Sequence, residues 1–449
     1  MRGIRVPAIA RIANLTRSPS FARLTSNAGW SVGGALAGRI AALVSAVLLA
    51  RILGPARYGE YVLVLATVTS VASLSTSGLG LAASKYLGDF HGAIESRRDV
   101  GVVVVGMSAF GYAGLSGVAL ALVAPLLALW HFHHAAMRGL LELGSLAVVP
   151  AIVQGVVQGA LNGLERFRTN ALMTTSSALS LACTVPFCAW LAGAAGALCA
   201  LIAVTGAWSF YGVWVARAGI DWRGALRTAW LRDETRRFVA LGTPVVMSAL
   251  VMAPINWIAL SLLASTPAGF AQVGQFNAAY QWYIGLTFIP AVIAGTVLPV
   301  LSRMRASGDG HGFALLTRHS IVANTLVACA SSLVVGLVAG RLMALYGAAY
   351  RDAAPLLRWL AVAAAANGLN AAIGQIMTAS NRLWIGLFVN LLWSAIYLGW
   401  ASWQVPRVGA LGLAQGLVVA YVVHTLIHLG FLRRHVREAA AGERHGRPA

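Results

Sequence analysis

Residues 27–50 read NAGWSVGGALAGRIAALVSAVLLA, and Arg39 is the one charged residue among them. A helix rises about 1.5 Å per residue, so this stretch is long enough to cross a hydrocarbon layer about 30 Å thick. A segment in lipid must pair every backbone polar group within itself, which a helix does. The stretch therefore predicts a membrane-spanning helix with a cation near its middle.

Similar apolar segments recur along the rest of the chain. Of the 449 residues, 59% are hydrophobic and 10% are charged, whereas a soluble domain carries roughly 25% charged residues. This composition excludes a soluble globular domain, a disordered chain and a disulfide scaffold, and it predicts an all-α membrane protein. Twelve transmembrane helices are expected near residues 27–50, 61–84, 100–129, 140–162, 171–192, 194–216, 238–264, 276–302, 320–346, 353–379, 383–403 and 409–432.

The basic residues orient these spans. The formal net charge is +20, a balance that often marks nucleic-acid binding. Here the arginines fall between apolar runs, and loops on the cytoplasmic side of a membrane are enriched in Lys and Arg. With both termini in the cytoplasm, 25 of the 33 basic residues lie on the inside and seven lie in outside loops. We therefore predict cytoplasmic termini and no nucleic-acid partner.

Two halves of the chain share one pattern. Gly59 and Gly274 open the second and eighth spans, and Arg166 and Arg382 follow the fourth and tenth, at offsets of 215 and 216 residues. The pattern predicts two six-helix lobes, related by pseudo-two-fold symmetry along the membrane normal, with a central cavity between them. The expected parts are a basic leader (1–24), an N-terminal lobe (25–216), a linker (217–237), a C-terminal lobe (238–432) and a basic tail (433–449).

Three loops carry a family resemblance. Residues 49–61, LARILGPARYGEY, resemble the first hairpin of the Wzx-type flippases in the multidrug/oligosaccharidyl-lipid/polysaccharide exporter superfamily, and residues 163–167 (GLERF) and 379–382 (ASNR) are similar to later loops of that family. The resemblance implies an inner-membrane transporter, not an enzyme, that moves polyprenyl-diphosphate-linked oligosaccharide to the periplasmic leaflet by alternating access. Its other implied partners are membrane lipids, a polysaccharide polymerase and export proteins. The resemblance does not identify the glycan.

Arg39 is the first candidate binding residue. About 17 Å of helix separates it from either end of its span, and a cation at that depth should face a wet cavity or an anion. A guanidinium forms bidentate bonds to phosphate groups, so the predicted ligand is the lipid diphosphate or an acidic sugar. The alternative is a structural arginine bonded to carbonyls of a broken helix.

Amide side chains inside the spans are the other candidates. They donate and accept hydrogen bonds, as sugar recognition requires, although amides also hold helix bundles together. Gln154 and Gln158, and Asn277 and Gln281, are pairs four residues apart and share a helix face. The predicted substrate-binding set is Arg39, Gln154, Gln158, Asn256, Asn277, Gln281 and Asn367.

Two rival functions are disfavoured by features that the spans and their connections lack. No acidic residue lies mid-span, which disfavours a multidrug or cation antiporter of the same superfamily, because an intramembrane carboxylate usually carries the coupled ion. The outside connections are short, which disfavours a membrane polysaccharide polymerase or ligase. The driving force remains open between membrane potential, a lipid gradient and ion coupling through His424 or His428.

The remaining residue types predict no catalytic residue, cofactor or metal site. His131, His133 and His134 cluster, but only Glu142 lies close in sequence as a further ligand. The four cysteines lie in apolar runs, and we interpret them as buried small residues. Glycines four residues apart predict closely packed helices: Gly34 with Gly38, and Gly155, Gly159 and Gly163.

Overall fold

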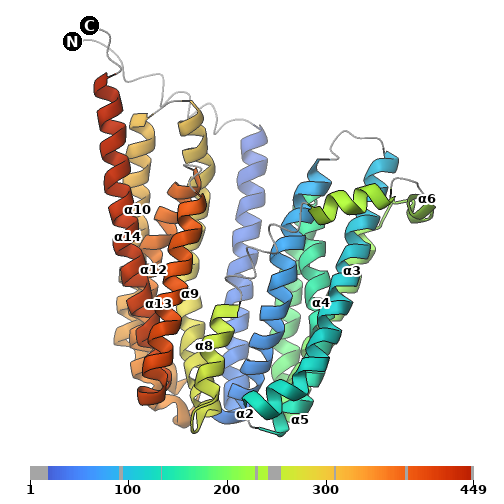
Figure 1. Cartoon of the computed structure of the whole chain (residues 1–449), viewed down its shortest axis with the longest axis vertical. Helices are drawn as coiled ribbons and strands as arrows, with labels where there is room; N and C mark the ends of the chain where they lie inside the picture. Colours follow the sequence, from blue (N-terminus) through green and yellow to red (C-terminus); the bar gives the residue numbers. More distant parts are fainter. Residues whose placement is uncertain are drawn as a thin grey trace.

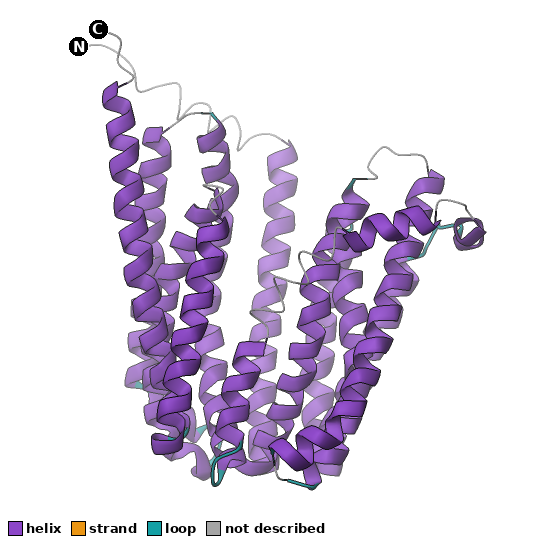
Figure 2. Cartoon of the chain, viewed as in Figure 1, coloured by secondary structure: helices purple, strands orange, loops and turns teal. Residues whose placement is uncertain are grey.

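The computed structural model describes residues 19–89, 95–132, 134–227, 231–240, 254–307, 310–379 and 383–445. Over these ranges the chain is a bundle of helices without strands (Figure 2). The α-helices are α2 (Pro19–Gly88), α3 (Glu95–Leu126), α4 (Ala136–Gly163), α5 (Phe167–Ala216), α6 (Trp222–Arg227), α8 (Pro254–Ala264), α9 (Gly269–Ala306), α10 (Gly310–Leu337), α11 (Ala339–Ala344), α12 (Ala354–Ala379), α13 (Leu383–Val408) and α14 (Ala410–His445). Two short helical segments are also described: the π-helix η1 (Leu127–His131) and the 3-10 helix η2 (Ala348–Ala353).

The predicted spans fall on these helices. Eight described stretches are long and apolar enough to cross a membrane. Two of them hold two predicted spans each, because α2 breaks at Gly54 (φ 71°) and α5 breaks at Gly193 (φ 62°), where glycine adopts a positive φ at little cost. With α8 and α9, all twelve predicted spans lie on helices, the seventh only in part because residues 241–253 lie outside the described ranges.

The structure describes part of each predicted end segment. Helix α2 begins at Pro19, inside the expected 1–24 leader, because proline suits the first turn of a helix. Residues 1–18 lie outside the described ranges. At the other end, α14 continues to His445 through most of the expected tail.

The helices form two lobes (Figure 1). The N-terminal lobe contains α2–α5, and the C-terminal lobe contains α8–α14. Helix α2 begins and α14 ends at the same end of the bundle, which we name the terminal end, and the lobes diverge toward it. They meet at the opposite end, which we name the closed end. Two lobes of six spans confirm the predicted architecture.

The lobes touch directly where α2 crosses α9. A Cβ atom on Gly59 would overlap the backbone oxygen of Phe270, and one on Gly274 would overlap the oxygen of Pro55. Only glycine allows this approach of two backbones. Gly59 and Gly274 occupy equivalent positions in the two sequence halves, so the predicted symmetry axis passes beside this contact.

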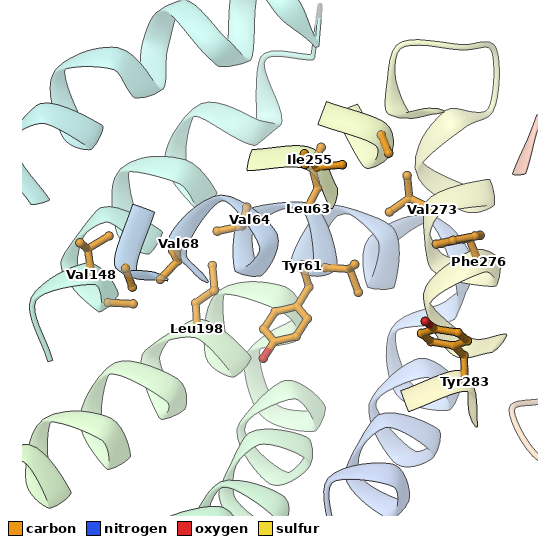
Figure 3. Packing of buried hydrophobic residues seen from close by; sticks show 14 of the residues in the cluster. Tyr61, Leu63, Val64, Val68, Val148, Leu198, Ile255, Val273, Phe276 and Tyr283 are labelled. Atoms are coloured by element: carbon orange, nitrogen blue, oxygen red, sulfur yellow. The ribbon is translucent and has the colours of Figure 1, made fainter. Parts of the chain in front are cut away.

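Hydrogen bonds and apolar packing reinforce the closed end. Arg51 Nε donates to the Leu345 oxygen at 2.6 Å, and Trp257 Nε1 donates to Thr67 Oγ1 at 2.9 Å. Figure 3 shows the buried cluster that continues from one lobe into the other, with Leu63 of α2 beside Ile255 of α8. The closed end is therefore a packed interface rather than a loop contact.

The linker docks on the N-terminal lobe. Its described helical parts are α6 and residues 231–237. Tyr86 donates from its hydroxyl to Glu234 Oε2 at 2.7 Å, and the Asp221 backbone donates to Asp99 Oδ2 at 3.1 Å. Both bonds attach the linker to α2 and α3 at the terminal end.

The cysteine interpretation was wrong. Cys183, Cys199 and Cys329 are exposed on the bundle surface, and Cys188 is half-buried. In a membrane helix an apolar side chain satisfies its surroundings by facing acyl chains, so it needs no protein partner. Exposed large residues such as Leu122 and Leu337 follow the same rule.

The predicted glycine packing is confirmed in the N-terminal lobe. A Cβ on Gly159 would overlap the Gly80 oxygen, and one on Gly163 would lie 2.6 Å from the Ser84 oxygen. Gly34 and Gly38 likewise meet Thr175 and Ala178 of α5. The α2–α4 and α2–α5 contacts therefore depend on small residues.

Replacing Gly159 with valine should destabilise the N-terminal lobe by about 3 kcal/mol or more, because the α2 backbone cannot move away locally. A thermal unfolding curve of the purified protein in detergent measures the effect. Gly139→Val on the same helix is the control, since no atom lies within 4 Å of its added Cβ. Equal unfolding midpoints for the two variants would contradict the packing role.

Candidate functional site

A cavity of about 450 Å³ lies between α2 and α4. It brings together Gln154 and Gln158, the pair expected to share a helix face, with the hydroxyls of Thr69 and Ser73. Gln154 Nε2 donates to Ser177 Oγ of α5 at 3.0 Å, which holds the amide in place. The cavity therefore presents fixed amide and hydroxyl groups that donate and accept.

A second cavity of about 210 Å³ lies between the lobes. Asn256 of α8 and the Asn277–Gln281 pair of α9 line it. Thr69 of α2 lines both cavities, so the two adjoin. Five of the six predicted amides thus converge on one surface.

Asn277 has a second role at this surface. Its Nδ2 donates to the Tyr58 hydroxyl at 3.1 Å, across the interface between the lobes. Phe276 and Tyr280 flank the amides from the same helix, with ring centroids 5.6 Å apart. The surface therefore combines hydrogen-bonding groups with flat aromatic faces.

Asn367 lies apart from the other candidates. It is in α12, outside both cavities, and its Nδ2 donates to the Tyr283 hydroxyl at 3.1 Å. Tyr283 donates in turn to the Tyr421 hydroxyl at 2.8 Å. These bonds hold α9, α12 and α14 together and match the bundle-holding alternative for amides.

Arg39 is exposed and lines neither cavity. Ala46 and Ala50, seven and eleven residues later, point from the same face of the helix, and both are buried near the closed end. Leu36, three residues before Arg39 and beside it on the helix, is also exposed, as is Ile40. The face that carries Arg39 is thus covered by protein where the lobes meet and uncovered where they diverge.

Sequence reasoning missed the hydroxyl and aromatic members of the site. Thr69 and Ser73 are four residues apart on a span that also carries other Ser and Thr residues, and Phe276 and Tyr280 stand directly before Asn277 and Gln281. The spacing rule that paired the amides would have found both sets.

Two of the clustered histidines contact the C-terminal lobe. His131 Nε2 lies 2.5 Å from Ser261 Oγ, and its ring stacks on Trp257. His134 packs against Phe270. His133 lies outside the described residues, as do residues 380–382 of the loop after the tenth span. The two described histidines belong to the closed-end interface.

Comparison with known families decides the classification. Residues 24–305 match the family described as polysaccharide biosynthesis protein. The chain belongs to this family. A curated relative from Ralstonia solanacearum, "EPS I polysaccharide export inner membrane protein EpsE", is 28% identical over 402 residues, covering 88% of this chain and 90% of the relative. The family resemblance predicted from the loops is confirmed.

Solved structures share the fold. "Lipid II flippase MurJ, inward closed conformation" matches 89% of this chain and 86% of its own with a TM-score of 0.76 at 13% identity. A structure described as the inward-facing conformation of a multidrug resistance MATE family transporter of the MOP superfamily matches 90% of this chain and 96% of its own, with a TM-score of 0.75 at 14% identity. This member of the polysaccharide biosynthesis family has the two-lobe fold of that superfamily.

Proposed function

We propose that the chain is a flippase that moves polyprenyl-diphosphate-linked oligosaccharide from the cytoplasmic to the periplasmic leaflet of a bacterial inner membrane. One observation carries the proposal: in a member of the polysaccharide biosynthesis family, five intramembrane amides converge on adjoining cavities beside the interface between the lobes. The exported unit serves cell-surface or exopolysaccharide synthesis. The relative's printed name, a polysaccharide export inner membrane protein, supports this role.

The site chemistry suits a glycan headgroup. Sugar hydroxyls both donate and accept, and the amides of Gln154, Gln158 and Gln281 do the same. Among the described residues the lining carries no charged side chain, so the proposed recognition there uses uncharged groups. Arg39 supplies a guanidinium for the diphosphate, while the polyprenyl chain stays among the exposed apolar side chains and the acyl chains.

The arrangement of the lobes corresponds to one step of alternating access. Both termini are cytoplasmic in the proposed topology, because that orientation puts most basic residues inside. The divergent terminal end then opens to the cytoplasm, and the closed end seals the periplasmic side. Separation of the lobes at the α2–α9 contact, with closure of the terminal end, would reverse the two openings.

A flipping assay tests the proposal. The full chain is reconstituted in liposomes that contain polyprenyl diphosphate N-acetylglucosamine with a fluorescent label, and dithionite quenches only probe in the outer leaflet. Protein-dependent loss of the protected fluorescence is the expected result. Chain elongation of the probe would instead indicate a polymerase. If the protein neither flips nor elongates the probe, the proposed substrate class is wrong.

The double variant Gln154→Leu/Gln158→Leu should slow flipping of this probe by about tenfold, because two net hydrogen bonds to the sugar are lost. The control probe is the same labelled lipid without its sugar, whose rate should stay within about twofold of the unchanged protein. An equal loss for both probes would show that the glutamines stabilise the bundle rather than recognise glycan.

A further inference from the structure

A pair of buried histidines lies in the C-terminal lobe, outside both cavities. His424 and His428 are one turn apart in α14, only 8% and 4% exposed. Their Nε2 atoms are 3.1 Å apart, and His428 Nδ1 is 3.0 Å from Asn370 Oδ1 of α12. Two imidazoles and an amide thus form one chain of hydrogen bonds.

The amide fixes the direction of this chain. Asn370 Nδ2 faces three acceptors: the Ala366 oxygen at 3.1 Å, Thr425 Oγ1 at 3.0 Å and the Tyr421 oxygen at 3.4 Å. Its Oδ1 is therefore the acceptor, and His428 Nδ1 must carry the proton that it donates. A neutral imidazole has one N–H, so His428 Nε2 accepts. His424 Nε2 is then the donor between the rings.

The Nδ1 atom of His424 carries no proton in this arrangement. Its Nε2 holds the proton, so its Nδ1 has a free lone pair, and this buried atom has no hydrogen-bond partner among the described residues. A buried polar atom without a partner is costly and calls for an explanation. A lone pair on imidazole is a proton-accepting group.

The titratable groups around the pair are tyrosines. Tyr421 of α14 stacks on His424, Tyr283 of α9 bonds to Tyr421, and Tyr397 of α13 packs against Trp393, which also contacts Tyr421. Helix α12 contributes Asn370 and Asn367. The described spans α9, α12 and α13 contain no acidic residue, so nearby carboxylates do not compete for the proton.

The pair is connected to the candidate substrate surface. Tyr421 bonds to Tyr283, whose ring stacks on Tyr280 with centroids 5.0 Å apart. Tyr280 lines the second cavity. A change of charge at His424 would therefore act on aromatic residues that reach the proposed glycan site.

We propose that the His424–His428 pair is a proton-binding site that couples proton movement to transport. A proton from water binds the lone pair of His424 Nδ1 and makes that ring an imidazolium, which keeps its Nε2–H bond to His428; release reverses the step. Charging a buried ring is costly, so the proton favours a conformation in which water reaches it. The proton thereby shifts the balance between the two openings.

The first test needs no substrate and therefore separates this inference from the proposed function on which its transport role rests. The full chain, labelled with ¹⁵N-histidine in liposomes, is titrated by solid-state NMR, with His424→Gln used to assign the signals. The expected result is an unprotonated His424 Nδ1 at high pH that gains a proton as the pH falls. A His424 Nδ1 protonated at every pH, or one that never titrates, would overturn the proposal.

The second test measures coupling. Flipping of the labelled polyprenyl diphosphate N-acetylglucosamine is followed with and without a pH gradient, with the membrane potential clamped. The unchanged protein and the His319→Gln control, which removes an exposed histidine of the same lobe, should respond to the gradient. His424→Gln should lose that response, so that its rates with and without the gradient are equal. An undiminished response in His424→Gln would refute the coupling role.

Discussion

Replacing Gly59 with leucine should lower transport by about 100-fold or more. The added side chain would overlap the backbone oxygen of Phe270, and a backbone clash of this kind costs about 3 kcal/mol or more. The cost falls only on the conformation in which α2 and α9 touch, so the variant should populate the other opening. The flipping assay measures the loss of transport.

A second measurement separates this shift from misfolding. Ser261 lies behind the closed end and is 2% exposed, so Ser261→Cys, in a background without the native cysteines, should resist a membrane-impermeant maleimide. Adding Gly59→Leu should make it reactive. The control is Gly295→Leu on α9, where no atom lies within 4 Å of the added Cβ. Unchanged labelling with full transport would refute the role of the glycine contact.

Replacing Arg39 with glutamine should slow flipping of a polyprenyl-diphosphate probe by about 10- to 100-fold, which corresponds to the loss of charge-assisted hydrogen bonds worth about 1.5–3 kcal/mol. Arg39→Lys keeps the charge but loses the planar fork, so an intermediate rate is expected. The measurement is the same assay, run with diphosphate and monophosphate forms of one labelled lipid.

The comparison between probes identifies the ligand of Arg39. A guanidinium that binds diphosphate bidentately should favour that form, and Arg39→Gln should remove most of the preference. Arg407→Gln is the control, because this exposed arginine bonds to Trp403 of its own helix. Normal rates for Arg39→Gln would exclude the diphosphate role. A reduced amount of folded protein would favour the structural alternative.

Several site features were predictable because they depend on neighbours along one helix. Gln154 with Gln158, and Asn277 with Gln281, share a face in any helix, and each pair does line one cavity. The close packing of Gly159 follows from small residues in the same way. Asn367 shows the limit of this reasoning. It is an amide within a span, like the other candidates, but it bonds to Tyr283 and lines neither cavity.

Other features depend on helices distant in sequence. The exposure of Cys183 followed from how α5 is rotated against its neighbours, which hydropathy does not record. The unprotonated Nδ1 of His424 depends on Asn370, 54 residues earlier, and on the four groups that bond to that amide. No periodicity within α14 contains this information.

The amino-acid sequence by itself determined the twelve helices, their division into two halves and the family of this protein. The reason is that backbone hydrogen bonds in lipid must close within each segment, so hydropathy and length suffice to find the spans. The tertiary structure decided which faces meet: the α2–α9 glycine contact, the shared amide surface and the direction of the histidine chain. These depend on the rotation and tilt of each helix, which packing between distant segments sets.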